Sequence, residues 1–301
     1  MQRVKKIDIH CHAVTESLIP FGNGAYFPTP DDMRKAYDVL GVERAVLLPL
    51  IDNISCPQPQ SLTDTLKMVK EYPNTIGWWF CNIDPAILYD SEDTDLSYFL
   101  LKLKELGAKG VGEVTRNLPF DHPLMFNLFK HCEKCEMPLL FHVGRQGGYG
   151  IIDQNGLVLL EKALKAFPYL IFIGHSTCFW NEISGDCGEK PLGEYHLGPV
   201  KEGGRVVELM RKYKNLYCDI SAGSGYFALT RDVEFTYKFL EEFQDRIYYG
   251  ADICVKDCYD LPLMKMSEFL DEAMENGKIS YECYVKICRE NALKLLGERD
   301  E

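Results

Sequence analysis

The segment KIDIHCH, residues 6–12, places two histidines at the end of a short run in which apolar and polar residues alternate. This alternation predicts a β-strand, in which every second side chain points to the same side. His10 and His12 would then project together. The opposite side would carry Ile7, Ile9 and Cys11. Two neighbouring imidazoles suit a divalent cation, although a His-x-His pair taken alone is more often a pair of hydrogen-bonded or surface histidines.

Similar short apolar runs recur along the chain, and a segment with helical spacing follows each one. We predict eight strands, at residues 6–12, 43–48, 76–82, 109–114, 138–143, 170–175, 216–221 and 247–252. The predicted helices cover residues 30–40, 62–71, 95–106, 123–135, 157–167, 204–213 and 233–243, with a closing helical region at 281–296.

Eight strands that alternate with helices predict a (β/α)₈ barrel, and the pattern runs through residues 1–301 as a single domain. A doubly wound open sheet is the alternative, because periodicity does not show whether a sheet closes. That alternative is disfavoured because no glycine-rich dinucleotide loop follows the first strand.

The composition narrows the class of partner. The chain has 301 residues, of which 46% are hydrophobic, enough for one large core. Its formal net charge of -12 would repel nucleic acids and anionic membranes. A small-molecule substrate is therefore expected.

The cysteines and the N-terminal residues indicate a cytoplasmic location. The 12 cysteines are scattered through apolar segments, which is typical of reduced, buried thiols. We find neither the pattern of a signal peptide nor an apolar run of the roughly 20 residues that span a membrane.

Three more candidate ligands occupy equivalent positions at the ends of predicted strands. His142 follows PLLF, His175 follows LIFIG, and Asp252 follows IYYGA. In a barrel, the carboxyl ends of the strands surround one pocket, where the active site lies. We expect these residues to converge with His10 and His12 on a divalent metal.

The motifs IDIHCH, PLLFHVG, FIGHS and YYGAD, with RENALKLLG near the C-terminus, resemble the amidohydrolase superfamily over nearly the whole chain. Within it, the chain is similar to the amidohydrolase-related branch that includes aminocarboxymuconate-semialdehyde decarboxylase. The resemblance implies that His10 and His12 bind the more buried metal and that His142 and His175 bind or polarise nearby. It implies that Asp252 is both ligand and proton acceptor, and it is consistent with a homodimer or larger assembly.

The fourth strand, KGVGEV, decides between one metal and two. Glu113 stands at its end, whereas Lys109, four residues earlier, would lie roughly 13 Å deeper. GVGEV resembles the Gly-Glu step of metal-dependent deoxyribonucleases of the same superfamily, so Glu113 is the candidate bridging ligand. An ion pair of Glu113 with Lys109 or Arg116 is the alternative.

Two residues in loops are candidates for substrate binding. Arg145 could hold a substrate carboxylate through its planar guanidinium, or it could be a surface arginine. Trp180, in the long segment 176–204, could form an apolar wall of the pocket, or it could pack within that segment. The pair Cys132 and Cys135 is expected to be structural, since no second pair lies near it.

These residues predict a metal-dependent hydrolase of a small amide, lactone or ester that carries a carboxylate. Zinc is the expected ion and manganese the alternative, with one or two ions bound; Asp252 and His175 are the expected catalytic residues. The alternatives are a nonoxidative decarboxylase of an unsaturated or aromatic carboxylate and a catalytically silent barrel that binds a ligand.

Overall fold

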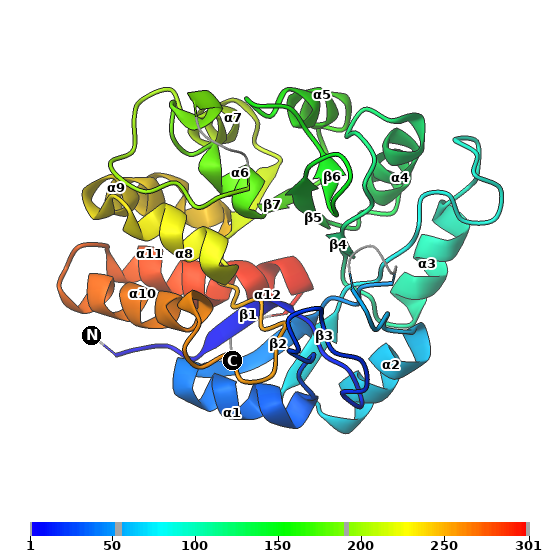
Figure 1. The fold of residues 1–301 in the computed structure, drawn as a ribbon, viewed down its shortest axis with the longest axis horizontal. Coiled ribbons are helices and arrows are strands. Elements are labelled where there is room, and N and C mark those ends of the chain that lie inside the picture. Colours follow the sequence, from blue (N-terminus) through cyan, green and yellow to red (C-terminus); the bar gives the residue numbers. More distant parts are fainter. Residues whose placement is uncertain (1, 52–55, 190–192, 299–301) are drawn as a thin grey trace.

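The protein forms a ring of parallel strands surrounded by helices, seen in a computed structural model that describes residues 2–51, 56–189 and 193–298 (Figure 1). The strands are β1 (Lys6–Cys11), β2 (Val42–Leu47), β3 (Ile76–Trp79), β4 (Val111–Val114), β5 (Leu139–Gly144), β6 (Ile151–Ile152), β7 (Phe172–His175), β8 (Leu216–Asp219) and β9 (Ile247–Tyr248). All but the short β6 correspond to the eight predicted strands.

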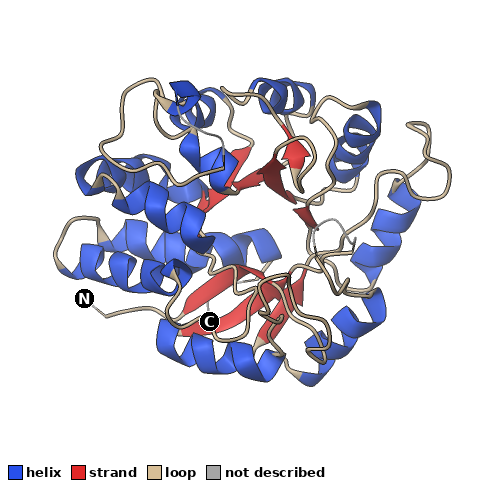
Figure 2. Ribbon diagram, in the orientation of Figure 1, coloured by secondary structure: helices blue, strands red, loops and turns tan. Residues whose placement is uncertain are grey.

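The helices are α1 (Pro30–Leu40), α2 (Leu62–Glu71), α3 (Ser97–Glu105), α4 (Pro123–Lys134), α5 (Val158–Ala166), α6 (Thr177–Asn181), α7 (Arg205–Lys212), α8 (Ala222–Thr230), α9 (Val233–Phe243), α10 (Met266–Glu275), α11 (Tyr281–Val285) and α12 (Asn291–Leu296). Apart from α12, the helices lie on the outside of this ring (Figure 2). No helix in these ranges combines the length and apolar character needed to cross a membrane.

Local sequence explains the helix starts that were predicted correctly. The α1 helix begins with Thr29 as N-cap, whose hydroxyl accepts from the Asp32 N–H, and with proline at the first helical position. Three helices, α6, α8 and α10, were not predicted. The sequence of α8, AGSGYFALT, has little amphipathic pattern, so its helical conformation depends on its packing within the barrel.

The strands pair in two sheets, in the orders β1-β2-β3 and β4-β5-β7-β8-β9, with β6 beside β5. A bridge between Cys81 and Val111 joins β3 to β4. On the other side, the Ile9 N–H donates to Tyr249 O at 3.1 Å, and Cys11 bridges to Ile253. These contacts complete the circuit of eight strands, so the predicted (β/α)₈ barrel is confirmed.

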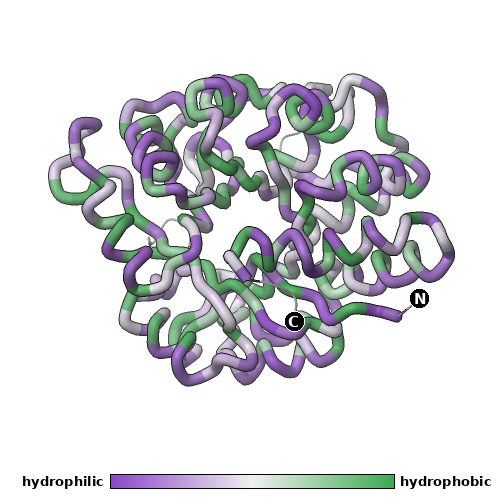
Figure 3. The backbone as a smooth tube through the Cα atoms, turned by 180° about the vertical axis from the view of Figure 1, so that it is seen from behind, coloured by the Kyte–Doolittle hydropathy of each residue, from purple (hydrophilic) through white to green (hydrophobic). Residues whose placement is uncertain are grey.

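Two hydrophobic layers hold the barrel together. The inner cluster is enclosed by the strands, and α12 packs against it. It contains Ile7, Ile9, Val46, Leu48, Trp78, Phe80, Leu140, Ile173 and Tyr248 with Ala292, Leu293 and Leu296. The larger outer cluster lies between strands and helices, and the outer helices carry both hydrophilic and hydrophobic turns (Figure 3).

The first strand departs from regular alternation. Ile7 and Ile9 pack in the inner cluster, but Cys11 packs in the outer one. The prediction that these three residues share a side is therefore wrong. The pairing with β2 shifts register between Asp8 and Cys11, and this irregularity reorients the side chains beyond Ile9.

The last strand is shorter than predicted, because β9 ends at Tyr248 and not at residue 252. Asp252 has a left-handed backbone conformation, with φ of 55°. Its N–H donates to His10 O at 2.8 Å, which ties this turn to the first strand.

Candidate metal centre

His10, in β1, and His12, just after this strand, approach each other through their Nε2 atoms. His10 Nε2 lies 3.1 Å from His12 Nε2. Their other ring nitrogens are held from behind: His10 Nδ1 lies 2.8 Å from Asp219 Oδ2, and His12 Nδ1 lies 2.7 Å from Leu48 O. Both side chains are buried. Asp219 and the Leu48 carbonyl thus orient the two rings so that both Nε2 atoms face the same place.

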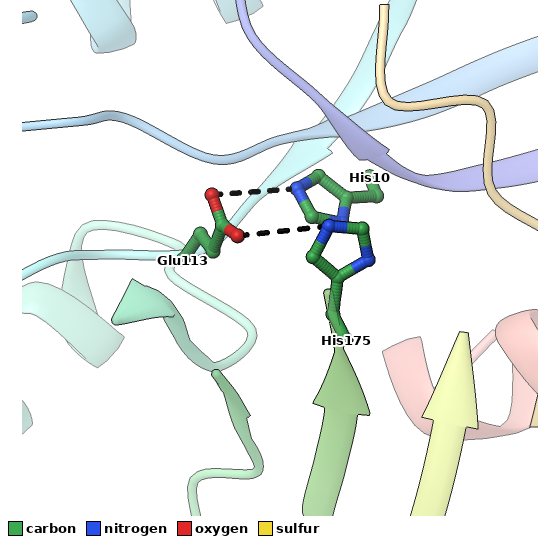
Figure 4. Close-up of side chains that lie close together, drawn as sticks. All are labelled: His10, Glu113 and His175. Atoms are coloured by element: carbon green, nitrogen blue, oxygen red, sulfur yellow. Dashed lines mark ion pairs between the residues drawn. The ribbon is translucent and has the colours of Figure 1, made fainter. Parts of the chain in front are cut away.

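Glu113, from β4, faces His10 and His175 (Figure 4). Its Oε2 lies 3.7 Å from His10 Nε2, and its Oε1 lies 3.8 Å from His175 Nε2. The same Oε1 lies 2.8 Å from His142 Nδ1, on β5. The preceding Gly112 lets β4 approach β5, because a Cβ there would lie 2.8 Å from Leu140 O. The Glu113 carboxylate therefore sits between histidines from three strands.

Asp252 completes the cluster from the loop after β9. Its Oδ1 lies 3.3 Å from His12 Nε2, and its Oδ2 lies 3.7 Å from His175 Nε2. Its side chain is 15% exposed, whereas those of His10, His12 and Glu113 are almost fully buried. Asp252 is thus placed between the buried ligand atoms and the solvent.

Asp219, at the end of β8, anchors two of the histidines and was not predicted. Besides His10, it contacts His175, whose Nδ1 lies 3.1 Å from Asp219 Oδ1. Ser221 donates both its hydroxyl and its backbone N–H to the same carboxylate. The sequence held a signal, since Asp219 lies near the end of a predicted strand as the proposed ligands do.

The charges in the cluster shift the pKa values of its members strongly. Burial alone would raise the pKa of Glu113, but His10 and His142 hold it well below its ordinary value. Burial would also raise the pKa of Asp219, and His175 and His10 instead hold it low. The pKa of His10 is raised well above its usual value, because the charges of Asp252 and Asp219 outweigh its burial. Without an ion, the site favours protons on His10 and His175, whose pKa values are both raised.

The donor set fits a divalent cation. Two groups have all their ligand atoms within 4.8 Å of one another, namely His10 with Glu113 and His175, and His10 with His12 and Asp252. Imidazole and carboxylate donors suit zinc, and each metal-binding histidine usually donates its second N–H to a carboxylate or carbonyl. Asp219 and Leu48 O occupy those second positions for His10, His12 and His175.

The other predicted residues lie around this cluster. Trp180 is buried behind it, and its indole N–H donates to Asp219 O at 3.1 Å. It packs against Phe179 and Phe239 instead of facing the opening. Arg145 is exposed in the loop after β5, with its guanidinium against Gly193. Cys132 and Cys135 are buried free thiols in and after α4.

Comparison with known proteins supports the fold. No protein-family model and no curated protein sequence matches the chain. Among solved structures, a TIM-barrel protein from Bordetella bronchiseptica has a TM-score of 0.65 at 16% identity, covering 98% of this chain and 99% of that one. An amidohydrolase from Burkholderia multivorans, solved with bound zinc, has a TM-score of 0.63 at 9% identity, covering 98% and 100%.

A third structure is the dihydroorotase of Campylobacter jejuni, with a TM-score of 0.57 and 13% identity over 99% of this chain and 84% of that one. Identities this low show a shared fold. The chain shares the (β/α)₈-barrel fold of these structures and carries a cluster of histidines and carboxylates at the carboxyl ends of its strands.

Proposed function

We propose that this chain is a metal-dependent hydrolase of the amidohydrolase superfamily that acts on a small carboxylate-bearing amide, lactone or ester. The observation that carries the proposal is the position of the buried Glu113 carboxylate, within 3.8 Å of ring nitrogens from β1, β5 and β7. Such a carboxylate is suited to bridge two cations. Zinc is the proposed ion, with manganese as the alternative.

His10, His12 and Asp252 would hold the ion nearer the first strand, His142 and His175 would hold or orient the second, and Glu113 would be a ligand of both. A divalent ion bound here would polarise the scissile carbonyl and lower the pKa of water to about 7. The histidines are pre-oriented for this role by Asp219 and Leu48 O.

Asp252 is the proposed proton carrier. It is the carboxylate of the cluster that is partly exposed, and its oxygens face His12 and His175. A carboxylate at this position can accept a proton from water and return it to the leaving group. The bond from its N–H to His10 O keeps the carboxylate beside the ligand atoms during both transfers.

Glu113 also favours hydrolysis over nonoxidative decarboxylation. A decarboxylase that uses one ion to orient its substrate has no need of a carboxylate from the fourth strand. In this protein Glu113 is instead held deprotonated by His10 and His142 in the centre of the cluster. A buried carboxylate with those partners is more useful as a ligand than as an isolated structural charge.

The first experiment measures metal per chain by elemental analysis, for the wild type and for Glu113→Gln, both purified without chelators. Two ions that fall to one in the variant would support the binuclear hydrolase. One ion in both proteins would remove Glu113 from the ligand set and favour decarboxylation. Product analysis in ¹⁸O-labelled water separates the two reactions, because release of carbon dioxide without incorporation of water contradicts hydrolysis.

The Asp252→Asn substitution tests the proton carrier. We expect kcat to fall by about 10² to 10⁴, the usual contribution of general acid–base catalysis, while the circular dichroism spectrum stays that of the wild type. Initial rates with a panel of small esters and lactones provide the measurement. Activity within threefold of the wild type would contradict this role.

A further inference from the structure

The cluster is open to solvent on one side. Among the six proposed ligands, His142 and Asp252 have the most exposed side chains, at 17% and 15%. We therefore expect a substrate to approach between the loop after β5, which follows His142, and the loop after β9, which contains Asp252. Residues along this approach can contact the part of the substrate next to the reacting carbon.

Tyr149, in the loop between β5 and β6, lies on this approach. Its ring centroid is 4.6 Å from that of His142, and the side chain is 45% exposed. Burial, together with the charges of Glu113 and Asp252, raises the pKa of Tyr149. A large aromatic side chain is thus held beside the ligands while much of its surface remains uncovered.

The loop that carries Tyr149 is rigidly built. Asn117 donates to Arg145 O and Gly150 O, and it accepts from the Gly147 N–H. Tyr149 O packs so closely on Gly144 that a Cβ there would lie 1.9 Å away. These contacts hold the backbone on both sides of Tyr149 and keep its ring exposed. Little further conformational entropy should therefore be lost when a ligand binds to the ring.

A second tyrosine, Tyr195, comes from the segment between α6 and α7. Its ring packs at 4.6 Å on Phe227 of α8, and the side chain is 48% exposed. The segment contacts the loop of Tyr149 directly, because Arg145 lies against Gly193. Its hydroxyl lies beside Gly223, near the start of α8, where a Cβ would approach it to 2.8 Å. Burial and the charge of Asp252 raise the pKa of Tyr195.

We propose that Tyr149, assisted by Tyr195, is a specificity-determining residue that selects substrates with a flat, conjugated group next to the reacting carbon. This inference rests on the proposed function, which identifies the reacting carbon as the carbonyl carbon that is hydrolysed. An exposed ring fixed against His142 offers its remaining face to a planar partner, and aromatic pairs gain energy beyond the area they bury. A saturated, puckered group of equal size would lose that contact.

The test is a binding measurement and needs no turnover. Benzoate and cyclohexanecarboxylate carry the same charge and nearly the same volume, but only benzoate is flat. Isothermal titration calorimetry on the metal-loaded protein should show tighter binding of benzoate. In Tyr149→Leu we expect a benzoate affinity weaker by about threefold to tenfold, while cyclohexanecarboxylate binds as before. Tyr149→Phe should retain the preference, because it keeps the ring.

Tyr169→Leu is the matched control, since that tyrosine is 88% exposed in the turn before β7, away from the ligands. Equal weakening of both ligands in Tyr149→Leu, equal affinities in the wild type, or no measurable binding of either acid would overturn the inference. The protein could also prefer benzoate through Tyr149 but hydrolyse none of the panel substrates. That outcome would contradict the proposed function and still support the role of Tyr149 in specificity.

Discussion

At the scale of single residues, Asp219 does more for the site than its position in the sequence suggests. One buried carboxylate contacts Nδ1 of both His10 and His175, which come from strands on different parts of the ring. It thereby sets which ring nitrogen of each histidine is available for a cation. Its position could be read from LYCDIS, but its partners could not, because they depend on which strands are neighbours.

Asp219→Asn should weaken metal binding by about tenfold to a hundredfold, the usual effect of losing an outer carboxylate partner of a ligand histidine. The amide keeps the size of the side chain but removes the charge that orients both rings. Competition with a coloured chelator measures the affinity. Asp121→Asn is the control, since that aspartate pairs with Lys162 at the surface. Equal affinities for Asp219→Asn and the wild type would contradict the anchoring role.

At the scale of elements, the loop between β5 and β6 shows how backbone conformation positions a ligand. Gly150 has φ of +95°, and a Cβ there would lie 2.8 Å from His142 Cδ2. Gly147, in the same loop, has φ of +83°, but a Cβ at that residue would meet nothing within 4 Å. Of these two glycines, only Gly150 is required by contact with the site.

Gly150→Ala should lower kcat/KM by about tenfold to a hundredfold, because the new methyl group displaces the His142 ring and small misplacements are costly in catalysis. Gly147→Ala carries a similar backbone strain without the contact, so it separates strain from displacement. Steady-state rates at saturating metal are the measurement. Equal losses in the two variants would assign the effect to loop strain alone.

The start of helix α5 is held by Asp153, whose contribution to stability should depend on pH. Asp153 accepts from the N–H groups of Gln154, Leu159 and Leu160, yet burial, helped by the charge of Glu182, raises its pKa to about 6. An acid whose pKa is raised on folding binds its proton more tightly in the folded state. Its contribution is therefore most favourable at low pH and is lost as the pH rises through 6.

The free energy of unfolding of the wild type, relative to Asp153→Asn, should accordingly be higher at pH 5 than at pH 7. Urea unfolding of both proteins at both pH values provides the comparison. Both proteins contain the same proposed metal ligands, so the titration of those groups cancels when the two free energies of unfolding are subtracted. A difference that is constant or larger at pH 7 would contradict the raised pKa.

At the scale of the whole molecule, the first strand is tied to the last helices by a buried ion pair. Lys6 Nζ lies 2.6 Å from Asp271 Oδ1 of α10, and Tyr284 of α11 donates its hydroxyl to the same oxygen at 2.7 Å. Lys6 and Asp271 are both buried. This contact joins residues 265 positions apart, so it helps to close the ring at the end opposite the metal ligands.

Lys6→Met should lower the free energy of unfolding by about 3 kcal/mol, because it leaves the buried Asp271 without its main partner. Activity per folded chain should not change, since the pair lies away from the ligands. Lys102→Met, which removes an exposed pair with Glu105, should have little effect. Equal stabilities of Lys6→Met and Lys102→Met would show that the pair does not contribute.

The sequence by itself determined the barrel and most of the residues proposed as metal ligands, because the signals for both are local. Strand alternation, helix caps and the recurrence of His or Asp at strand ends are read within a few residues, as for α1, His142 and Asp252. The α8 helix and the early end of β9 were missed, since packing and a left-handed turn outweigh local preference there.

Only the tertiary structure decided how these residues meet. In the folded chain Glu113 lies between three histidines, and Asp219 contacts both His10 and His175. Trp180 is buried behind the site, whereas Tyr149 lies partly exposed beside His142. Each of these contacts depends on strand neighbours, register shifts and loop backbone conformation. Such features arise from long-range packing, which a linear pattern does not record.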